Sequence, residues 1–160
     1  MQTWVSTDYD IIKTAIKLLK RERESMRIVV IDGQGGGMGK SIIENIRKKY
    51  HDSEIIAVGT NSLATSAMLR AGASAGATGE NAVIFNCGEA DIIAGPVGIC
   101  FANSMHGEIS PAMASAISSS RAEKILIPMS KCHAHIIGIA ERSFGSYIEE
   151  MMEKLESIMR

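Results

Sequence analysis

Residues 26–41 read MRIVVIDGQGGGMGKS, and this stretch decides the expected fold. Its first half is short, continuous and β-branched, which is typical of a strand that is buried on both faces. Five glycines follow within seven positions, and residues 41–50 then show a helical pattern with Ile42, Ile43 and Ile46 as its buried side. A strand, a glycine-rich turn and a helix in this order predict the first unit of a parallel α/β sheet.

The rest of the chain alternates short apolar runs with amphipathic stretches. The pattern predicts strands at residues 54–59, 91–94, 124–128 and 135–140, and helices at residues 61–70, 111–120 and 143–159. Residues 71–82 are almost all small and stay unassigned, while residues 83–87 fit either a strand or a short helix, so the state of 79–89 remains open. The fold class expected is α/β, with a Rossmann-like, doubly wound and mainly parallel sheet. Right-handed crossovers would bring the carboxyl ends of all strands to one edge.

Two parts of the chain are expected. Residues 1–25 are predicted to be an appended amphipathic helix, and residues 26–160 a single Rossmann-like domain, which suits a length of 160 residues. The helix carries its apolar residues on one stripe: Val5, Tyr9, Ile12, Ile16 and Leu19. It is basic, whereas the last helix is acidic, so one hypothesis is that the terminal helices pair within a chain or in a homo-oligomer.

Composition excludes several classes of protein. Hydrophobic residues make up 46% of the chain, which is too many for a disordered protein. A net charge of −1 and only 4% aromatic residues argue against a nucleic-acid binder. No apolar run is long enough to span a membrane, and three cysteines without a CxxC pair favour a reducing, cytoplasmic location.

The glycine-rich loop is predicted to hold a phosphorylated small-molecule ligand. Glycine lets the backbone approach a ligand, and the amides at a helix N-terminus attract an anion. Main-chain N–H groups between Asp32 and Ser41 are therefore expected to converge on one phosphate. The predicted contact residues are Gly33, Gln34, Gly35, Gly36, Gly37, Met38, Gly39 and Lys40. The structural alternative is a tight turn that packs the helix close against the sheet.

Two nucleotide-binding patterns compete for this loop. Gly33, Gly37 and Gly39 satisfy GxxxGxG, as in short-chain dehydrogenase-like domains, but Met38 interrupts the usual GxGxxG. The Walker A pattern fails because Gln34 stands where its first glycine belongs. NAD(P) and ATP both remain candidate cofactors.

The ends of two other strands are expected to line the same crevice. The residues concerned are Gly59, Thr60, Asn61, Gly95 and Pro96. NAD-binding domains usually carry an acidic residue after the second strand, and this chain has none there. Thr60 or Asn61 would have to bind the ribose instead, although Asn61 fits equally well as the N-cap of the next helix.

Catalytic candidates are few. His106 and Glu108 would form an acid/base pair, or else belong to a polar loop before residue 111. Cys132 is a candidate nucleophile, and no metal site is predicted because Cys132, His133 and His135 lack further ligands at zinc spacing. Whether the protein is an enzyme stays open. The alternatives to simple ligand binding are a small-metabolite enzyme, NAD(P)-dependent or phosphate-handling, and a P-loop-like ATP-binding regulatory module that acts through a protein partner.

Six strings carry a resemblance to a known family: VVIDGQGGGMGK, AVGTNSLATSAMLRAGA, ATGENAV, ADIIAGPVGI, ANSMHGEISPAMA and KILIP. From about residue 26 to about residue 138 the chain resembles the uncharacterised bacterial family catalogued as domain of unknown function 3842. The resemblance implies a Rossmann-like sheet with a nucleotide-type glycine-rich loop. It implies no catalytic residues, because the family has none assigned.

Overall fold

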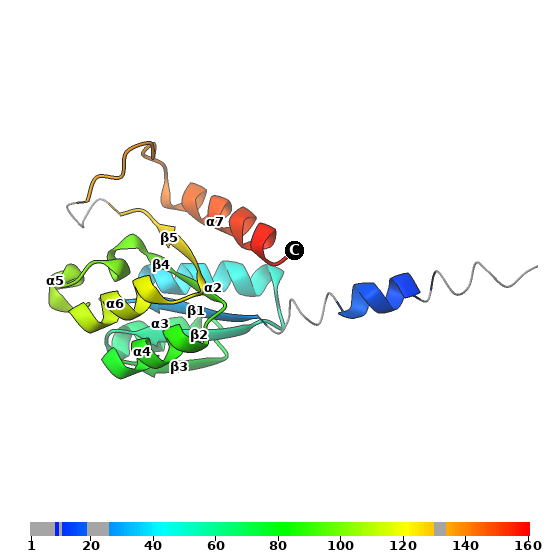
Figure 1. Cartoon of the computed structure of the whole chain (residues 1–160). Helices are drawn as coiled ribbons and strands as arrows, with labels where there is room; N and C mark the ends of the chain where they lie inside the picture. Colours follow the sequence, from blue (N-terminus) through cyan, green and yellow to red (C-terminus); the bar gives the residue numbers. More distant parts are fainter. Residues whose placement is uncertain (1–8, 10, 19–25, 130–133) are drawn as a thin grey trace, which may run out of the picture.

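The structure is a computed structural model that describes residue 9 and residues 11–18, 26–129 and 134–160 (Figure 1). At its centre lies a five-stranded sheet in the order β3-β2-β1-β4-β5, in which every neighbouring pair is parallel. The strands are β1 (Arg27–Asp32), β2 (Glu54–Gly59), β3 (Ala75–Thr78), β4 (Ile92–Pro96) and β5 (Glu123–Ile127). The helices are α2 (Gly37–Lys49), α3 (Ser62–Arg70), α4 (Glu80–Glu89), η1 (Val97–Cys100), α5 (Ser104–Gly107), α6 (Pro111–Ser119) and α7 (Phe144–Ile158).

Helices cover both faces of this sheet, so its inner strands β1, β2 and β4 are buried on two sides. In β1, Ile28 and Val30 pack in the core that α2, α3 and α7 share, while Val29 and Ile31 pack in the core of α4 and α6. All four side chains are fully buried. Period-2 alternation between two apolar layers explains why the strand reads as a continuous apolar run. The predicted Rossmann-like α/β fold is confirmed.

The strand order creates one point where the chain changes direction. From β1 the chain moves outward through β2 to β3, and it then returns to add β4 and β5 on the other side of β1. The connections that follow β1 and β4 therefore diverge, which leaves a crevice beyond the carboxyl ends of these two strands.

Two elements differ from the sequence prediction: one helix begins earlier, and one strand has no counterpart in the prediction. The helix predicted from residue 41 begins four residues earlier, at Gly37, because the last part of the glycine run is itself helical. Strand β3 was not predicted, since its sequence AGAT has no apolar pattern, and its residues are mainly exposed at the sheet edge. Its register with β2, from Ile56 opposite Ala75 to Gly59 opposite Thr78, places it in the sheet.

Residues 79–89, which the sequence left open, contain a helix. In α4, Val83 and Cys87 are buried four positions apart, while Ile84 and Phe85 face outward. The predicted strand at residues 135–140 is wrong. Those residues are exposed and belong to no strand, Ile137 is 94% exposed, and Gly138 has a left-handed φ of 89°. Apolar content alone suggested a strand, but these residues pair with none of the strands of the sheet.

The terminal helices are partly described. Residues 11–18 are helical, and Ile11, Ile12 and Ile16 are each more than half exposed. The remainder of the predicted 1–25 segment, apart from residue 9, lies outside the described residues. The last helix agrees with its prediction and begins at the N-cap Ser143, and Lys49 of α2 forms an ion pair with Glu156 of α7 at 2.6 Å. Within the part of the chain that the structure describes, we find no helix whose length and apolarity would let it cross a membrane.

Candidate functional site

The loop after β1 makes a tight turn before α2 begins. The amide of Gly36 donates to the carbonyl of Gly33 at 2.9 Å. Gln34 (φ 51°) and Gly36 (φ 69°) both adopt the left-handed backbone conformation that glycine accepts readily and other residues rarely do. We call residues 33–37 the glycine loop.

Asp32, the last residue of β1, ties the strand to the first turn of α2. Its Oδ1 accepts the amide of Gly33 at 2.8 Å, and its Oδ2 accepts the amide of Gly39 at 2.7 Å. Asp32 as a whole is only 5% exposed. Burial raises the pKa of Asp32, against the hydrogen bonds from the amides of Gly39, Gly33 and Met38, which favour the charged form. This carboxylate caps the positive end of α2 from inside the protein.

A second carboxylate, that of Glu108, binds the glycine loop from a distant part of the chain. Its Oε2 accepts the amide of Gln34 at 2.8 Å, the side-chain amide of Asn61 at 3.0 Å, and the hydroxyl of Thr60. Burial would raise the pKa of Glu108, but these hydrogen bonds outweigh it, and the pKa lies below its ordinary value. One carboxylate therefore joins the loop after β4 to the ends of β1 and β2.

Most amides of the glycine loop and of the first turn of α2 are thus occupied by the protein itself. Besides the bonds to Asp32 and Glu108, the Lys40 amide donates to the carbonyl of Gly36 at 2.8 Å. Within residues 26–129 and 134–160, the amides of Gly35 and Gly37 have no acceptor. Several of the amides between Asp32 and Ser41 that the sequence predicts to converge on one anion are therefore held by two carboxylates of the protein instead. Two donors remain.

The five glycines between residues 33 and 39 fall into two groups. A Cβ on Gly33 would lie 2.8 Å from Glu108, Met105 and Thr60 side-chain atoms, a Cβ on Gly36 2.7 Å from the Cα of Ala64, and a Cβ on Gly39 against the sulfur of Met68. Packing therefore requires these three.

Gly35 and Gly37 form the second group. A Cβ at either position would meet no atom within 4 Å, and neither residue has a positive φ. Neither packing nor backbone conformation explains why these two positions are glycine. They are also the two loop residues whose amides have no acceptor among the described residues.

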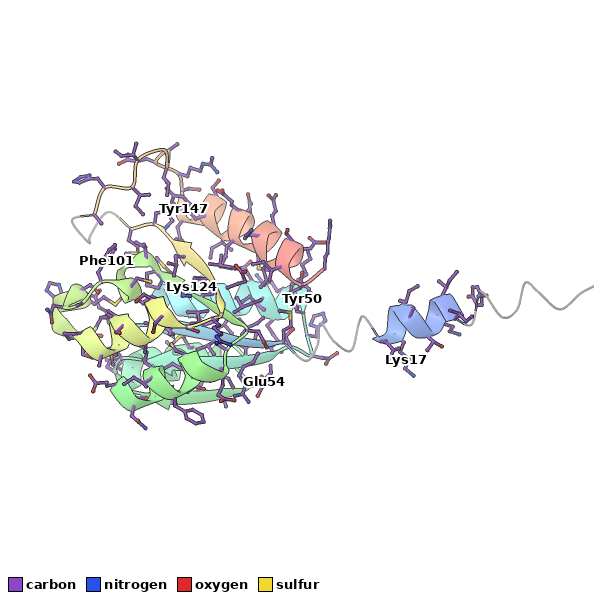
Figure 2. All side chains as sticks on the ribbon, in the orientation of Figure 1. Lys17, Tyr50, Glu54, Phe101, Lys124 and Tyr147 are labelled. Carbon is purple, nitrogen blue, oxygen red and sulfur yellow. The ribbon has the colours of Figure 1, made fainter. Side chains whose placement is uncertain are left out.

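A cavity of about 530 Å³ lies beside the glycine loop, at the switch point between β1 and β4. Its walls are formed by Asp32, the whole glycine loop, Met38, Pro96, Phe101, Ala102, Asn103, Ser104, Met105, His106 and Met129. Figure 2 shows Phe101 at this end of the domain, opposite Tyr50 and Glu54 near the amino ends of the strands. Met38, Phe101, Met105 and Met129 make part of the wall apolar.

The non-glycine residues with a positive φ also lie around this cavity. Among the described residues, four non-glycine side chains sit on a positive φ: Gln34, Asn103, Met105 and His106. All four line this cavity. Such conformations cost of order 1–3 kcal/mol each and concentrate at functional sites. The cavity is therefore the leading candidate site.

A family model with the description Domain of unknown function (DUF3842) matches residues 27–160. The chain belongs to this family. The match runs from β1 through α7, and so extends past residue 138, where the sequence resemblance ended. No curated protein is similar enough to match.

Several predicted ligand residues of this DUF3842 domain do line the cavity. They are Gly33, Gln34, Gly35, Gly36, Gly37, Met38 and Pro96. Of the catalytic candidates, His106 lines it as well, whereas Glu108 is not among its lining residues and accepts the amide of Gln34. Cys132 and His133 lie outside the described residues.

Other predicted ligand residues of the domain have structural roles instead. Gly39 packs under Met68, and Lys40 is exposed with its Nζ 3.8 Å from Glu44. Gly59 is pressed against Thr65, and Gly95 against the carbonyl of Ile31, so a side chain at either position would clash.

Thr60 and Asn61 also lie outside the cavity. Both bind Glu108, and Asn61 is the N-cap of α3, accepting the amide of Ala64 at 2.9 Å. The N-cap alternative for Asn61 is thus confirmed.

Sequence reasoning missed two kinds of site residue. Asp32 stands directly before the glycine run, and this position at the end of a strand is the signal that could have indicated it. Phe101, Met105 and Met129 carried no signal, because apolar residues in irregular segments follow no period. Among the residues that the structure describes, no group of three or more His, Cys, Asp or Glu side chains could hold a metal ion.

Proposed function

We propose that this protein binds a phosphorylated small molecule, of nucleotide type, with a phosphate on the amides of Gly35 and Gly37. One observation carries the proposal: among the described residues, the two loop glycines that packing does not require are the two whose amides lack an acceptor, and both line the cavity. Omitting a side chain there lets an oxyanion approach the backbone.

The electrostatics and the size of the cavity support the same ligand class. The amide of Gly37 opens α2, whose positive dipole end favours an anion within its first turn. A volume of about 530 Å³ is within the range of small-molecule sites. The thioether and aromatic groups of Met38, Phe101 and Met129 suit a flat apolar part of the ligand.

The loop favours a Rossmann-type ligand over a P-loop type. A P-loop wraps a phosphate with many amides and a lysine. Here Asp32 and Glu108 hold several of those amides, and Lys40 pairs with Glu44 at 3.8 Å. Two free amides suit a bridging phosphate group such as that of a dinucleotide, so NAD(P) is favoured over an ATP-binding regulatory module.

Catalysis remains the second candidate. His106 is the titratable imidazole at the cavity wall, and it sits on a left-handed φ of 58°. If the protein acts on a small metabolite, His106 is the group in position to exchange a proton with it. Loss of turnover in His106→Ala with ligand binding intact would support this role of His106, and turnover that the substitution leaves unaffected would remove it.

The binding proposal is tested with the whole chain. Small molecules that co-purify with it are identified by mass spectrometry, and NAD, NADP and ATP are each tested for a rise in thermal midpoint. We expect at least one of the three to raise it. The absence of any shift, together with no co-purified phosphorylated compound, would contradict the proposal and leave a structural subunit as the alternative.

A homo-oligomer through the terminal helices also remains proposed. The apolar side chains of Ile11, Ile12 and Ile16 are exposed on one helix, and Glu149, Glu150 and Glu153 are exposed on α7. Removing residues 1–24 should lower the solution mass to that of one chain, whereas an unchanged mass and thermal midpoint would defeat the pairing. We also propose a cytoplasmic location, which the free thiols of Cys87 and Cys100 support.

A further inference from the structure

The end of β2 lacks the acidic residue that holds the ribose in NAD-binding domains, yet a carboxylate lies there in space. Glu108 reaches this position from the segment after β4. Its Oε2 accepts from Thr60 and Asn61, which are the residues that directly follow β2. Glu108, which is distant in sequence, therefore supplies a carboxylate at the end of β2, where the sequence that follows the strand has no acidic residue.

We infer that Glu108 is the ribose-binding residue of this site, and that its Oε1 accepts the hydroxyls of an unmodified ribose. This assignment rests on the proposed function and narrows it. The ligand class becomes a nucleotide whose 2′- and 3′-hydroxyls are both free.

The hydrogen-bonding capacity of Glu108 supports the assignment. Its Oε2 already accepts three donors, from Gln34, Thr60 and Asn61. Its Oε1 has no hydrogen-bond partner among the described residues, and the side chain is partly exposed. An ionised carboxylate only accepts hydrogen bonds and has about four lone-pair sites. The complementary group is one that donates, and a vicinal diol supplies two donors.

The segment that carries Glu108 is fixed by its own backbone. The amide of Asn103 donates to the carbonyl of Ile109 at 2.7 Å, and the amide of Gly107 donates to the carbonyl of Asn103 at 3.2 Å. The amide of Glu108 donates to the carbonyl of Met105 at 3.2 Å. The carboxylate is thus held in place before a ligand arrives, which reduces the entropy lost on binding.

The spacing fits a single nucleotide. The amide that binds Glu108 belongs to Gln34, and the first free amide belongs to the next residue, Gly35. Consecutive Cα atoms are about 3.8 Å apart. A phosphate on Gly35 and a ribose hydroxyl on Glu108 can therefore belong to neighbouring groups of one ligand, with its other end in the cavity.

Charge then determines selectivity. A 2′-phosphate would lie beside the ionised carboxylate and be repelled, and a 2′-deoxyribose would offer one donor fewer. NAD should therefore bind more tightly than NADP, and ATP more tightly than 2′-deoxy-ATP. A hydroxyl bonded to a charged acceptor contributes enough for about a tenfold difference in affinity.

The experiment measures the affinities of these two matched pairs for the wild-type chain and for Glu108→Gln. Glutamine keeps an oxygen for the three donors and replaces Oε1 by an uncharged NH₂ group, so a purely structural role of Glu108 would survive. Glu123→Gln, an exposed acid at the amino end of β5, is the control. We expect the control to match the wild type, and Glu108→Gln to lose about tenfold in affinity for the ribonucleotide and most of the preference within the pair.

Four results would overturn the assignment. Equal affinities within each pair for the wild type, or a preference that Glu108→Gln leaves unchanged, would remove Glu108 from the ribose site while leaving the proposed function standing. A gain in affinity in Glu108→Gln would mean that the carboxylate competes with the ligand for the loop. Binding of none of the four nucleotides to the wild type would overturn both this assignment and nucleotide binding itself.

Discussion

The Oδ2 of Asp32 lies 2.7 Å from the amide nitrogen of Gly39, so the carboxyl end of β1 holds the first turn of α2 directly. In most helices the N-terminal amides are capped by the residue just before the helix. Here the cap comes from the strand, across the glycine loop. The loop is thereby freed from capping, and its remaining amides are available to the cavity.

Removing this cap should destabilise the domain. Asp32→Ala leaves the buried amides of Gly33 and Gly39 without an acceptor, and each such loss costs about 1–3 kcal/mol. Asp32→Asn retains one acceptor oxygen and should lose about half as much. Urea unfolding at pH 7 measures both free energies. Equal stability of Asp32→Ala and the wild type would contradict the cap.

The same carboxyl group predicts a pH dependence. Because burial raises the pKa of Asp32, the folded state binds its proton more tightly than the unfolded state does. The contribution of Asp32 to the unfolding free energy should therefore fall as pH rises from about 4, the ordinary value for aspartate, through the raised value. The difference between wild type and Asp32→Asn, measured by urea unfolding from pH 3 to pH 7, isolates this effect. A contribution that rises with pH would show that the pKa is lowered instead.

Two neighbouring glycines should respond differently to the same change. Gly36→Ala places a Cβ 2.7 Å from the Cα of Ala64 on a backbone with φ 69°, and should lower the unfolding free energy by about 1–3 kcal/mol. Gly35→Ala meets no atom within 4 Å and should stay within about 0.5 kcal/mol of the wild type. Urea unfolding compares them. A similar loss in both variants would mean that the loop needs Gly35 for folding.

Cys87 should be inert in the folded protein. Burial raises its pKa to about 11, so only about 0.1% of it is thiolate at pH 8. Alkylation by iodoacetamide at pH 8 should be on the order of a hundredfold slower at Cys87 in the native chain than in the chain unfolded in guanidinium. Peptide mass spectrometry follows the residue individually. Equal rates would show that α4 opens readily.

Sequence patterns were sufficient where one element buries a regular face. The run 28–31 predicts β1 because its apolar residues fill two layers at once, and the stripe of Ile148, Met151 and Leu155 predicts α7 in the same way. The pattern failed where burial does not determine the structure. β3 is an edge strand of small residues, and residues 135–140 are apolar but exposed.

The site was predictable only in part. The glycine run correctly indicated the loop that lines the cavity, because glycine is the residue that strained turns and close approaches require. It could not indicate which glycines packing uses, since that depends on Ala64 and Met68 in another helix. Nor could it show that Glu108 reaches Gln34, because a contact between side chain and backbone over such a separation leaves no periodic signal.

The central claim is that the backbone at Gly35 and Gly37 receives the ligand, and calorimetric titration of matched valine variants tests it most directly. The probe is whichever of NAD, NADP and ATP raises the thermal midpoint of the wild type most. In Gly37→Val and in Gly88→Val the added Cβ meets no described atom within 4 Å, but only Gly37 lines the cavity. We predict that Gly88→Val binds the probe like the wild type, while Gly37→Val keeps its thermal midpoint and loses at least about tenfold in affinity. Wild-type affinity in Gly37→Val would contradict the account.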